Sequence, residues 1–460
     1  MQTPPLQQEI RRSWTRIGSK FLPFADAATP DLPLSRLLRL SLFQVSVGMA
    51  LVLMIGTLTR VMIVELKVPA SLVGIMIALP LIFAPFRAII GFRSDHHRSA
   101  LGWRRVPYLW MGTMVQFGGL AIMPFALLVL SGGGAASQSP VWVGWLGAGI
   151  AFLMVGAGLH TTQTVGLALA TDLAPVESQP NVVGLMYVML LLGMIVSALV
   201  FGLLLADFSP ARLVQVLQGA AVITLVLNVT ALWKQEGRHR STQPVRQDPT
   251  FKESWAAFTS GSDAVRRLIA VGLGTMAFSM EDVLLEPYGG EILHMSVGAT
   301  TALTATLAFG GLSGFALASH VLNRGMDPFR MASIGAQVGV PAFVAVICSA
   351  SLGSPVLFSL GVFLIGFGGG LFGHGTLTAT MNLAPKEQSG LALGAWGAVQ
   401  ASAAGIAIAL GGVIRDVAAS QTAPTTAYAV VYSIEIGLLI ATMWAMSPLI
   451  RRAAARRASA

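Results

Sequence analysis

Charged residues are scarce in this sequence. Asp, Glu, Lys and Arg make up 11% of the 460 residues, whereas ordinary soluble domains carry roughly 25%. Hydrophobic residues make up 54% of the chain, and the mean hydropathy is +0.73. So few charges cannot cover a water-facing surface. We therefore expect the lipid bilayer to be the solvent for most of the chain.

Cysteine and catalytic motifs are also nearly absent. The one cysteine, Cys348, lies in an apolar run, which excludes an intramolecular disulfide and a thiolate metal site. There is no nucleophile–base pairing, phosphate-binding loop or metal-cage spacing, so we expect no enzyme, no catalytic residues and no bare-metal site. The first apolar run begins near Leu37 without a small-residue cleavage site after it, so we expect this span to be retained.

Long apolar runs dominate the sequence instead. A helix needs about 20 apolar residues to cross a hydrocarbon core of about 30 Å. We expect an all-α membrane protein with about twelve transmembrane helices. They are predicted near residues 40–64, 69–92, 106–130, 141–171, 182–206, 212–233, 265–286, 292–319, 328–350, 355–381, 389–413 and 426–449.

Basic residues fall mainly on one side of these spans. They gather in the N-terminal segment, the loop between the second and third spans, the central loop and the tail. The other side carries only Arg60, Lys67, Arg212 and Arg415. The positive-inside rule then predicts that both termini and the central loop are cytoplasmic. This orientation explains the formal charge of +9, and we expect no nucleic-acid partner.

A sequence repeat divides the chain into two halves. Ala170-Thr-Asp-Leu-Ala-Pro175 recurs 210 residues later as Thr380-Met-Asn-Leu-Ala-Pro385, and the same offset pairs Gly184 with Gly394. Two parallel six-span repeats are typical of the major facilitator superfamily, so we expect that fold, with two pseudo-symmetric six-helix halves.

The repeat and the polar central loop set the expected segments. These are a cytoplasmic N-terminal segment with an amphipathic helix (1–36), a six-helix bundle (37–233), a cytoplasmic linker (234–264), a second six-helix bundle (265–450) and a basic cytoplasmic tail (451–460). The amphipathic helix would lie on the anionic leaflet. The alternative is a partly disordered basic segment.

The loop after the second span resembles a cytoplasmic motif of the same superfamily. It runs Gly91-Phe-Arg-Ser-Asp-His-His-Arg98 and continues as Gly102-Trp-Arg-Arg105. In that motif an acid and nearby basic residues lock helix ends together. We expect this lock to involve Asp95, Arg98, Arg104 and Arg105. The alternative is that these charges only set the topology.

Two histidines lie within predicted spans. His160 is about 18 Å along its helix from Asp172, near the bilayer middle. Under the 210-residue offset, His374 corresponds to Thr164, one turn from His160. Neutral imidazole can ligate a ring-bound metal such as the magnesium of a chlorin, so both are candidate pigment ligands. The alternative is a hydrogen bond to a neighbouring helix.

Glycines surround His374 in the tenth span and clear room for a flat ligand or a close helix. The expected groove residues are Gly366, Gly369, Gly370 and Gly373. A partner helix could dock at Gly310-x-x-x-Gly314 or Gly366-x-x-x-Gly370. The alternative, ordinary packing within the chain, is the commoner use of such patterns.

Charged residues also lie near the outer ends of the first and seventh spans. We expect Arg60 to bridge Glu281, Asp282 or Glu286 and to close the periplasmic side. The alternative is that the acids face water while Arg60 extends toward the interface. Glu435 has no obvious partner in the sequence.

Several motifs resemble the PucC/LhaA family, the bacteriochlorophyll-delivery branch of the superfamily. They are Gly91-Phe-Arg-Ser-Asp-His-His-Arg98, Leu101-Gly-Trp-Arg-Arg-Val-Pro-Tyr108, Leu159-His-Thr-Thr-Gln-Thr164 and Glu281-Asp-Val-Leu-Leu-Glu-Pro-Tyr-Gly-Gly290. The resemblance covers about residues 30 to 450, and the last motif is the most specific. The family offers no settled ligand residues to carry over.

The resemblance implies an assembly factor for the light-harvesting antennae of purple bacteria, located in the inner (intracytoplasmic) membrane. It implies transient handling of bacteriochlorophyll and the antenna α and β polypeptides as partners. The bacteriochlorophyll synthase and the membrane insertion machinery are further expected partners. The alternative is a transporter of a small molecule or pigment precursor.

Overall fold

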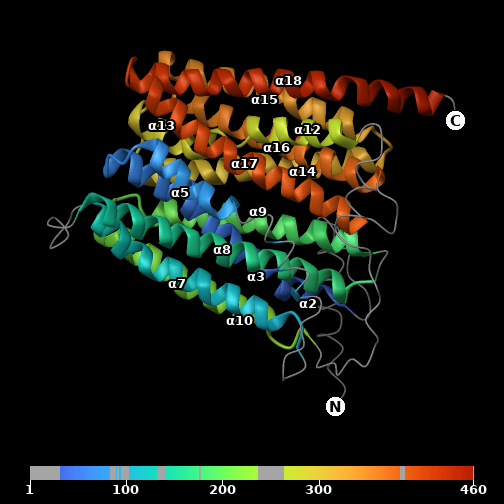
Figure 1. Ribbon diagram of the computed structural model, residues 1–460, viewed down its shortest axis with the longest axis horizontal. Helices are drawn as coiled ribbons and strands as arrows, with labels where there is room; N and C mark the ends of the chain where they lie inside the picture. Colours follow the sequence, from blue (N-terminus) through green and yellow to red (C-terminus); the bar gives the residue numbers. More distant parts are fainter. Residues whose placement is uncertain are drawn as a thin grey trace, which may run out of the picture.

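The computed structural model describes residues 32–82, 87, 90, 93–94, 103–131, 140–175, 178–236, 264–383 and 389–458. Within these residues every regular element is a helix, and the long helices run side by side (Figure 1). Eleven are long and apolar enough to cross a membrane, and the shorter apolar helix Ala70–Leu81 stands at the predicted second span. The prediction of an all-α, multi-pass membrane protein is confirmed.

The first half of the described chain begins with a continuous span from Leu34 to Glu65. Its segments are α2 (Leu34–Leu40), α3 (Leu42–Leu51), η2 (Val52–Thr57), α4 (Leu58–Arg60) and η3 (Val61–Glu65). The spans that follow are α5 (Ala70–Ile82), α7 (Val106–Leu130), α8 (Val141–Leu173), α9 (Gln179–Leu204) and α10 (Pro210–Leu232).

The second half begins with a broken span. It consists of α12 (Ala264–Ala277), η6 (Glu281–Val283) and α13 (Leu285–Glu291). The spans that follow are α14 (Val297–Asn323), α15 (Pro328–Leu352), α16 (Pro355–Leu383), α17 (Ser389–Ala419) and α18 (Pro424–Ala458). Most of the predicted tail, 451–460, therefore continues α18 as helix. The predicted N-terminal amphipathic helix lies outside the described residues.

Helix ends follow local sequence signals, as α15 illustrates. Asp327 caps this helix by accepting a hydrogen bond from the backbone N–H of Arg330. Pro328 occupies the first helical position, where a backbone N–H would have no partner in the helix. At the far end, Gly353 adopts a φ of 56°, the left-handed conformation that glycine tolerates best.

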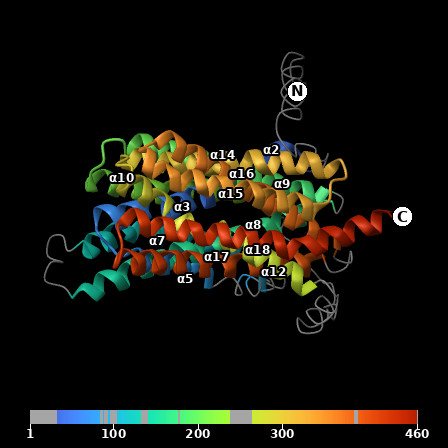
Figure 2. The ribbon, with the colours of Figure 1, turned by 90° about the horizontal axis from the view of Figure 1, so that it is seen from above.

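The helices pack as two groups. In the first group α7 packs on α8 and α10, and α3 packs on α9. In the second group α16 packs on α14 and α15, while α18 packs on α12 and α15. Extensive contacts between the groups are made by α5 with α17 and by α9 with α14 (Figures 1 and 2).

The start of α2 and the end of α18 lie at one end of the molecule (Figure 1). The two groups of helices meet closely at the other end, which we call the opposite end. A Cβ atom on Gly298 of α14 would lie 2.5 Å from the carbonyl oxygen of Gly202 in α9. A Cβ atom on Gly412 of α17 would collide with the backbone of Ala70 in α5. Glycine thus permits backbone contact between the groups here.

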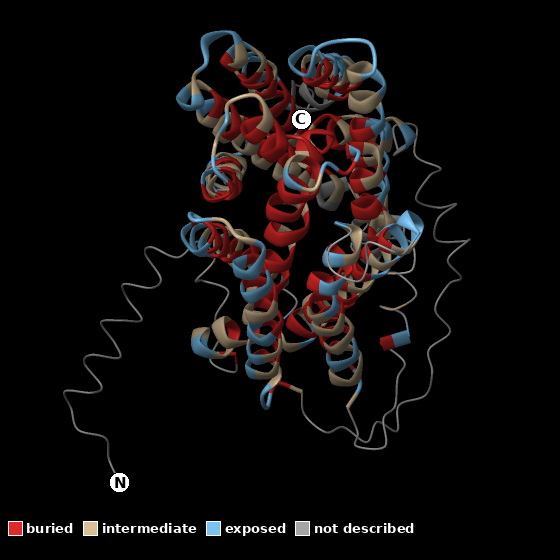
Figure 3. Ribbon diagram, turned by 90° about the vertical axis from the view of Figure 1, so that its left-hand side faces the viewer, coloured by how far each residue is buried: buried red, intermediate tan, exposed pale blue. Residues whose placement is uncertain are grey.

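The outer faces of the helices are apolar. Buried residues gather between the helices, and exposed residues face outward (Figure 3). Large side chains such as Phe125, Leu203 and Trp444 are 65%, 78% and 76% exposed. This is the distribution expected where hydrocarbon is the solvent.

Candidate functional site

Both candidate pigment ligands have one ring nitrogen without a partner among the described residues. His160 lies in α8 and His374 in α16, and each is partly exposed. The Nδ1 atom of each ring is buried without a hydrogen-bond partner among the described residues. The ring of Phe315 lies with its centroid 4.2 Å from that of His374. The alternative use, a hydrogen bond to a neighbouring helix, is therefore not seen at either Nδ1.

The predicted glycine groove is divided between packing and open space. Cβ atoms on Gly366 and Gly370 would collide with the carbonyl oxygens of Leu307 and Gly311 in α14. A Cβ atom on Gly369 would lie 3.8 Å from Phe278. Gly373, next to His374, has no atom within 4 Å of such a Cβ. Open space therefore remains at one of the four glycines.

The glycine pairs predicted as docking positions for a partner helix are occupied within the chain. Cβ atoms on Gly310 and Gly314 would collide with the carbonyl oxygens of Phe363 and Phe367. Together with Gly366 and Gly370, these residues interlock α14 and α16. The docking interpretation is wrong for both pairs, because internal backbone packing already uses them.

The fit to a magnesium tetrapyrrole rests on the same observations. His160 and His374 would supply the axial nitrogen, and the space at Gly373 leaves room beside one of them. Such a pigment would bring a Lewis-acidic magnesium that accepts a neutral imidazole. The residues present are compatible with it. The partner on the second ring nitrogen that usually orients a ligating histidine is lacking among the described residues.

Arg60 pairs differently from the prediction. Its Nη1 lies 2.9 Å from Oε1 of Glu65, and its side chain packs against Gly290 of the Glu281–Gly290 motif. Within η3 the backbone forms a π turn, in which residues five apart are aligned. That turn places Glu65 beside Arg60. Of the three predicted partners, Glu286 interacts with Arg60 only electrostatically.

Glu286 instead joins elements from both groups of helices. The Thr304 hydroxyl of α14 donates to Glu286 Oε1 at 2.5 Å. A Cβ atom on Gly56 of η2 would collide with the same carboxylate. Thr57 and Thr301 lie beside this contact with their hydroxyl oxygens 3.3 Å apart. The first span is thus held against α13 and α14.

Glu435, for which the sequence suggested no partner, lies in a cluster of acidic side chains. It is fully buried in α18, close enough to Glu281 and Asp282 of the seventh span to interact electrostatically. The carboxyl groups of Glu435 and Glu281 lie close enough to share a hydrogen bond when one of them is protonated. No group of His, Cys, Asp and Glu side chains in the described ranges has the arrangement needed for a metal ion.

A polar latch at the opposite end was not predicted. The backbone N–H of Ser71 donates to Asp416 Oδ2 at 2.7 Å, which ties α5 to α17. Arg415 pairs with Glu291 at 2.5 Å, and the Tyr428 hydroxyl donates to Glu291 at 2.8 Å. Ser71, Glu291, Arg415 and Asp416 border an open cavity of about 520 Å³. The only sequence signal was the adjacent pair of opposite charges at 415 and 416.

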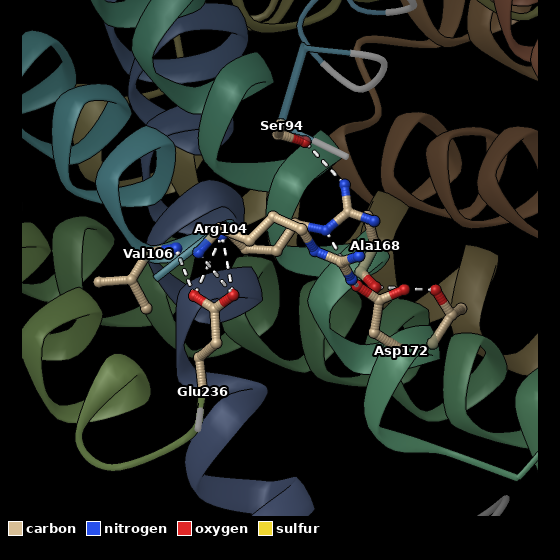
Figure 4. A network of polar contacts seen from close by, with 8 residues as sticks. Ser94, Arg104, Val106, Ala168, Asp172 and Glu236 are labelled. Carbon is tan, nitrogen blue, oxygen red and sulfur yellow. Dashed lines mark hydrogen bonds and ion pairs between the residues drawn. The ribbon is translucent and has the colours of Figure 1, made fainter. Parts of the chain in front are cut away.

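The loop lock contains two of the four predicted residues. Both arginines pair with Oδ2 of Asp172 at the end of α8 (Figure 4). The distance is 2.6 Å from Nη2 of Arg104 and 3.0 Å from Nε of Arg105. Arg105 also donates to the Ser94 hydroxyl at 2.7 Å. Asp95 and Arg98 lie outside the described residues. Asp172 was missed as a partner, although it belongs to the repeated Ala170–Pro175 motif.

Glu236 is the second acid of this lock. Its carboxylate accepts hydrogen bonds from the backbone N–H groups of Arg104, Arg105 and Val106 (Figure 4). These donors lie at the N-terminus of α7 and have no partners within the helix, so Glu236 caps it. Glu236 lies four residues after the last residue of α10, Leu232, so the lock joins the ends of α7, α8 and α10.

Comparison with solved structures shows the fold. A POT family transporter in complex with a thioalcohol-conjugated peptide has a TM-score of 0.67, with 13% identity and coverage of 93% of this chain and 99% of that one. A D-xylose–proton symporter also has a TM-score of 0.67, with 14% identity and coverage of 89% and 96%. The predicted major facilitator fold is confirmed.

Comparison with sequences shows the family. "Protein PucC" of Rhodovulum sulfidophilum is 66% identical over 87% of this chain and 89% of its own length. "Protein PucC" of Cereibacter sphaeroides is 59% identical over 97% and 99%. A "Bacteriochlorophyll synthase 44.5 kDa chain" of Rhodobacter capsulatus is 27% identical over 92% and 97%. The model of the family described as PUCC protein matches residues 57–454, and the chain belongs to that family.

Proposed function

We propose that this protein is an assembly factor for light-harvesting antenna complexes, which handles bacteriochlorophyll and aids oligomerisation of the antenna α and β polypeptides. The 66% identity to a protein named PucC carries this proposal. In this role the protein binds and positions its clients and catalyses no reaction. Bacteriochlorophyll is a transient ligand.

The geometry supports a ligand that is flat and apolar. His160 and His374 are partly exposed, and Nδ1 of each ring has no hydrogen-bond partner in the described ranges. Open space adjoins His374 at Gly373. The surrounding surface is apolar, so a tetrapyrrole with an isoprenoid tail could reach these residues from the membrane without crossing water. Antenna helices would have to dock elsewhere than at the interlocked glycine pairs of α14 and α16.

The proposed location is the inner, intracytoplasmic membrane, with both termini in the cytoplasm. The lock of Arg104, Arg105, Asp172 and Glu236 would then face the cytoplasm, and the latch at Asp416 would face the periplasm. Further proposed partners are the bacteriochlorophyll synthase and the membrane insertion machinery. A relative that is named as a chain of the synthase supports the first of these.

The test is gentle solubilisation from a pigmented host, followed by absorption spectroscopy and identification of co-purifying polypeptides. Bacteriochlorophyll together with antenna polypeptides is the expected result. A colourless protein without antenna partners would contradict the proposal. Pigment content should fall in His160→Ala, His374→Ala or the double variant. The exposed His320 of α14 supplies the matched control, His320→Ala, which should keep the full pigment content.

The fold also favours a second function, transport of a small molecule or pigment precursor. The supporting observation is that the two groups of helices meet closely at the opposite end through Gly298 and Gly412. Such closure is the arrangement that an alternating-access transporter needs in one of its states. Uptake of a polar solute by proteoliposomes, without pigment or antenna binding, would favour this function over the first.

A further inference from the structure

Arg87 has only neutral hydrogen-bond partners among the residues that the structure describes. Its Nε donates to Thr164 Oγ1 and its Nη2 to Gln163 Oε1, each at 2.9 Å. Both acceptors are neutral. No carboxylate lies within ion-pair distance of Arg87 in the part of the chain that the structure describes. A guanidinium has five N–H donors, so three of them have no acceptor among the described residues.

Two further polar side chains lie around this guanidinium. His160 of α8 and Tyr187 of α9 are both close enough to interact with Arg87 electrostatically. His160 lies one helical turn before Thr164, and its Nδ1 is buried without a partner among the described residues. Arg87, His160 and Tyr187 are all partly exposed. These three side chains come from three different segments of the first group of helices.

An arginine whose described partners are all neutral requires an explanation in a chain of membrane-spanning helices. Charged side chains inside a membrane are costly and mark ligand or ion sites. Gln163 and Thr164 fix the orientation of the guanidinium, but they do not neutralise it. A site has this form when the opposite charge arrives with the ligand, because arginine binds carboxylates and phosphates through strong, often bidentate hydrogen bonds. The apolar spans around it favour a ligand that is otherwise greasy.

We propose that Arg87, with His160 and Tyr187 beside it, binds the acidic end of an amphipathic ligand. Two sources of this chemistry exist in a photosynthetic membrane. One is the free carboxylate of a tetrapyrrole acid such as bacteriochlorophyllide, which rests on the proposed function. The other is the phosphate of an anionic lipid, which does not. A tetrapyrrole whose carboxylate is esterified offers no such charge.

The experiment compares neutral and acidic forms of each ligand. The full-length protein, in nanodiscs of phosphatidylcholine, is titrated with bacteriochlorophyllide and with its methyl ester while absorption is recorded. In a second arm, native mass spectrometry measures retention of phosphatidylglycerol against phosphatidylcholine. The variants are Arg87→Gln and Arg87→Lys. Arg212→Gln is the matched control, because Arg212 is exposed at the opposite end beside Asp207.

The wild type should bind the free acid about tenfold or more tightly than the ester, or retain the anionic lipid selectively. Arg87→Gln should abolish the preference, Arg87→Lys should keep part of it, and Arg212→Gln should leave it unchanged. A role of Arg87 in helix packing alone would lower stability without changing these ratios. If Arg87→Gln fails to fold, Arg87→Lys tests the proposal, and a preference unchanged from the wild type would contradict it.

The two proposals fail in different ways. Equal binding of acid and ester, without selective lipid retention, overturns the acidic-ligand site and leaves pigment handling intact. Absence of any tetrapyrrole binding, together with Arg87-dependent retention of phosphatidylglycerol, supports the site and counts against pigment handling. Absence of both overturns both proposals.

Discussion

Ser71 and Asp416 connect the two groups of helices by one hydrogen bond of 2.7 Å, from a backbone N–H at the start of α5 to a carboxylate near the end of α17. The bond lies beside the contact of Gly412 with Ala70, so polar and steric closure coincide there. The acceptor is charged and the donor belongs to the backbone. A change at Asp416 therefore removes the bond without altering α5.

Asp416→Ala should open the opposite end. Loss of a hydrogen bond to a charged acceptor costs about 1.5–3 kcal/mol, enough to change the ratio of closed to open molecules at least tenfold. Spin labels at Leu204→Cys and Val356→Cys, two exposed positions, should report a longer and broader distance distribution. The background is Cys348→Ser, because the native cysteine is exposed.

The control for this measurement is Asp207→Ala. Asp207 also has an arginine neighbour, but its side chain is 97% exposed. The distance distribution should therefore stay that of the parent protein. An unchanged distribution in Asp416→Ala as well would show that the hydrogen bond to Ser71 does not hold this end closed.

Gly298→Ala should destabilise the protein. The added Cβ would lie 2.5 Å from the carbonyl oxygen of Gly202, and overpacking of this kind costs about 1–3 kcal/mol. Gly437→Ala should be neutral or slightly stabilising, because nothing lies within 4 Å of its Cβ and alanine favours helix by about 1 kcal/mol. Thermal unfolding in detergent measures the midpoint temperature of each variant. Equal midpoints for Gly298→Ala and Gly437→Ala would contradict the close approach of α9 and α14.

Glu236→Ala should loosen the start of α7. The change removes the acceptor for three backbone N–H groups, and loss of a helix cap costs about 0.5–2 kcal/mol. Hydrogen exchange of the first turn of α7 should become faster, while exchange in α15, capped by Asp327, should not. Glu236→Gln keeps an acceptor oxygen and should give an intermediate rate. Uniform acceleration across both helices would point to general destabilisation instead.

Arg60 should couple energetically to Glu65 and only weakly to Glu281. Double-mutant cycles on the free energy of unfolding should give a coupling energy of about 1 kcal/mol between Arg60 and Glu65. The value is modest because Arg60 is buried but Glu65 is partly exposed to solvent. The substitutions Arg60→Met, Glu65→Gln and Glu281→Gln keep the side-chain volumes similar. Stronger coupling to Glu281 would restore the pairing that the sequence suggested.

The spans were predictable because the bilayer fixes their length and allows little charge in them. Arg104 and Arg105 were predictable because the motif places them in a short loop. The cap at Glu236 was not, since its contact with Arg105 joins residues 131 positions apart. The glycine pairs of α14 and α16 were visible in the sequence, but spacing alone cannot tell which helix fills them.

The Arg60–Glu65 pair shows a different limit. An α-helical period places residues three or four apart on one face, so the spacing of five gave no signal. Only the π turn aligns them, and nothing in Val61–Glu65 marks that turn in the sequence. The acids of the seventh span were therefore the nearest candidates, although the structure uses an acid from the same span.

The π turn also lets the first span hold one residue more than an α-helix would in the same place. Deleting one residue between Val61 and Glu65 would let the backbone return to ordinary α-helical bonding. Glu65 would then stand four residues after Arg60, a spacing that an α-helix places on one face, so the ion pair should survive the deletion. The extra residue is an insertion that the helix absorbs locally, whereas a deletion in a regular α-helix would rotate every later residue by about 100°.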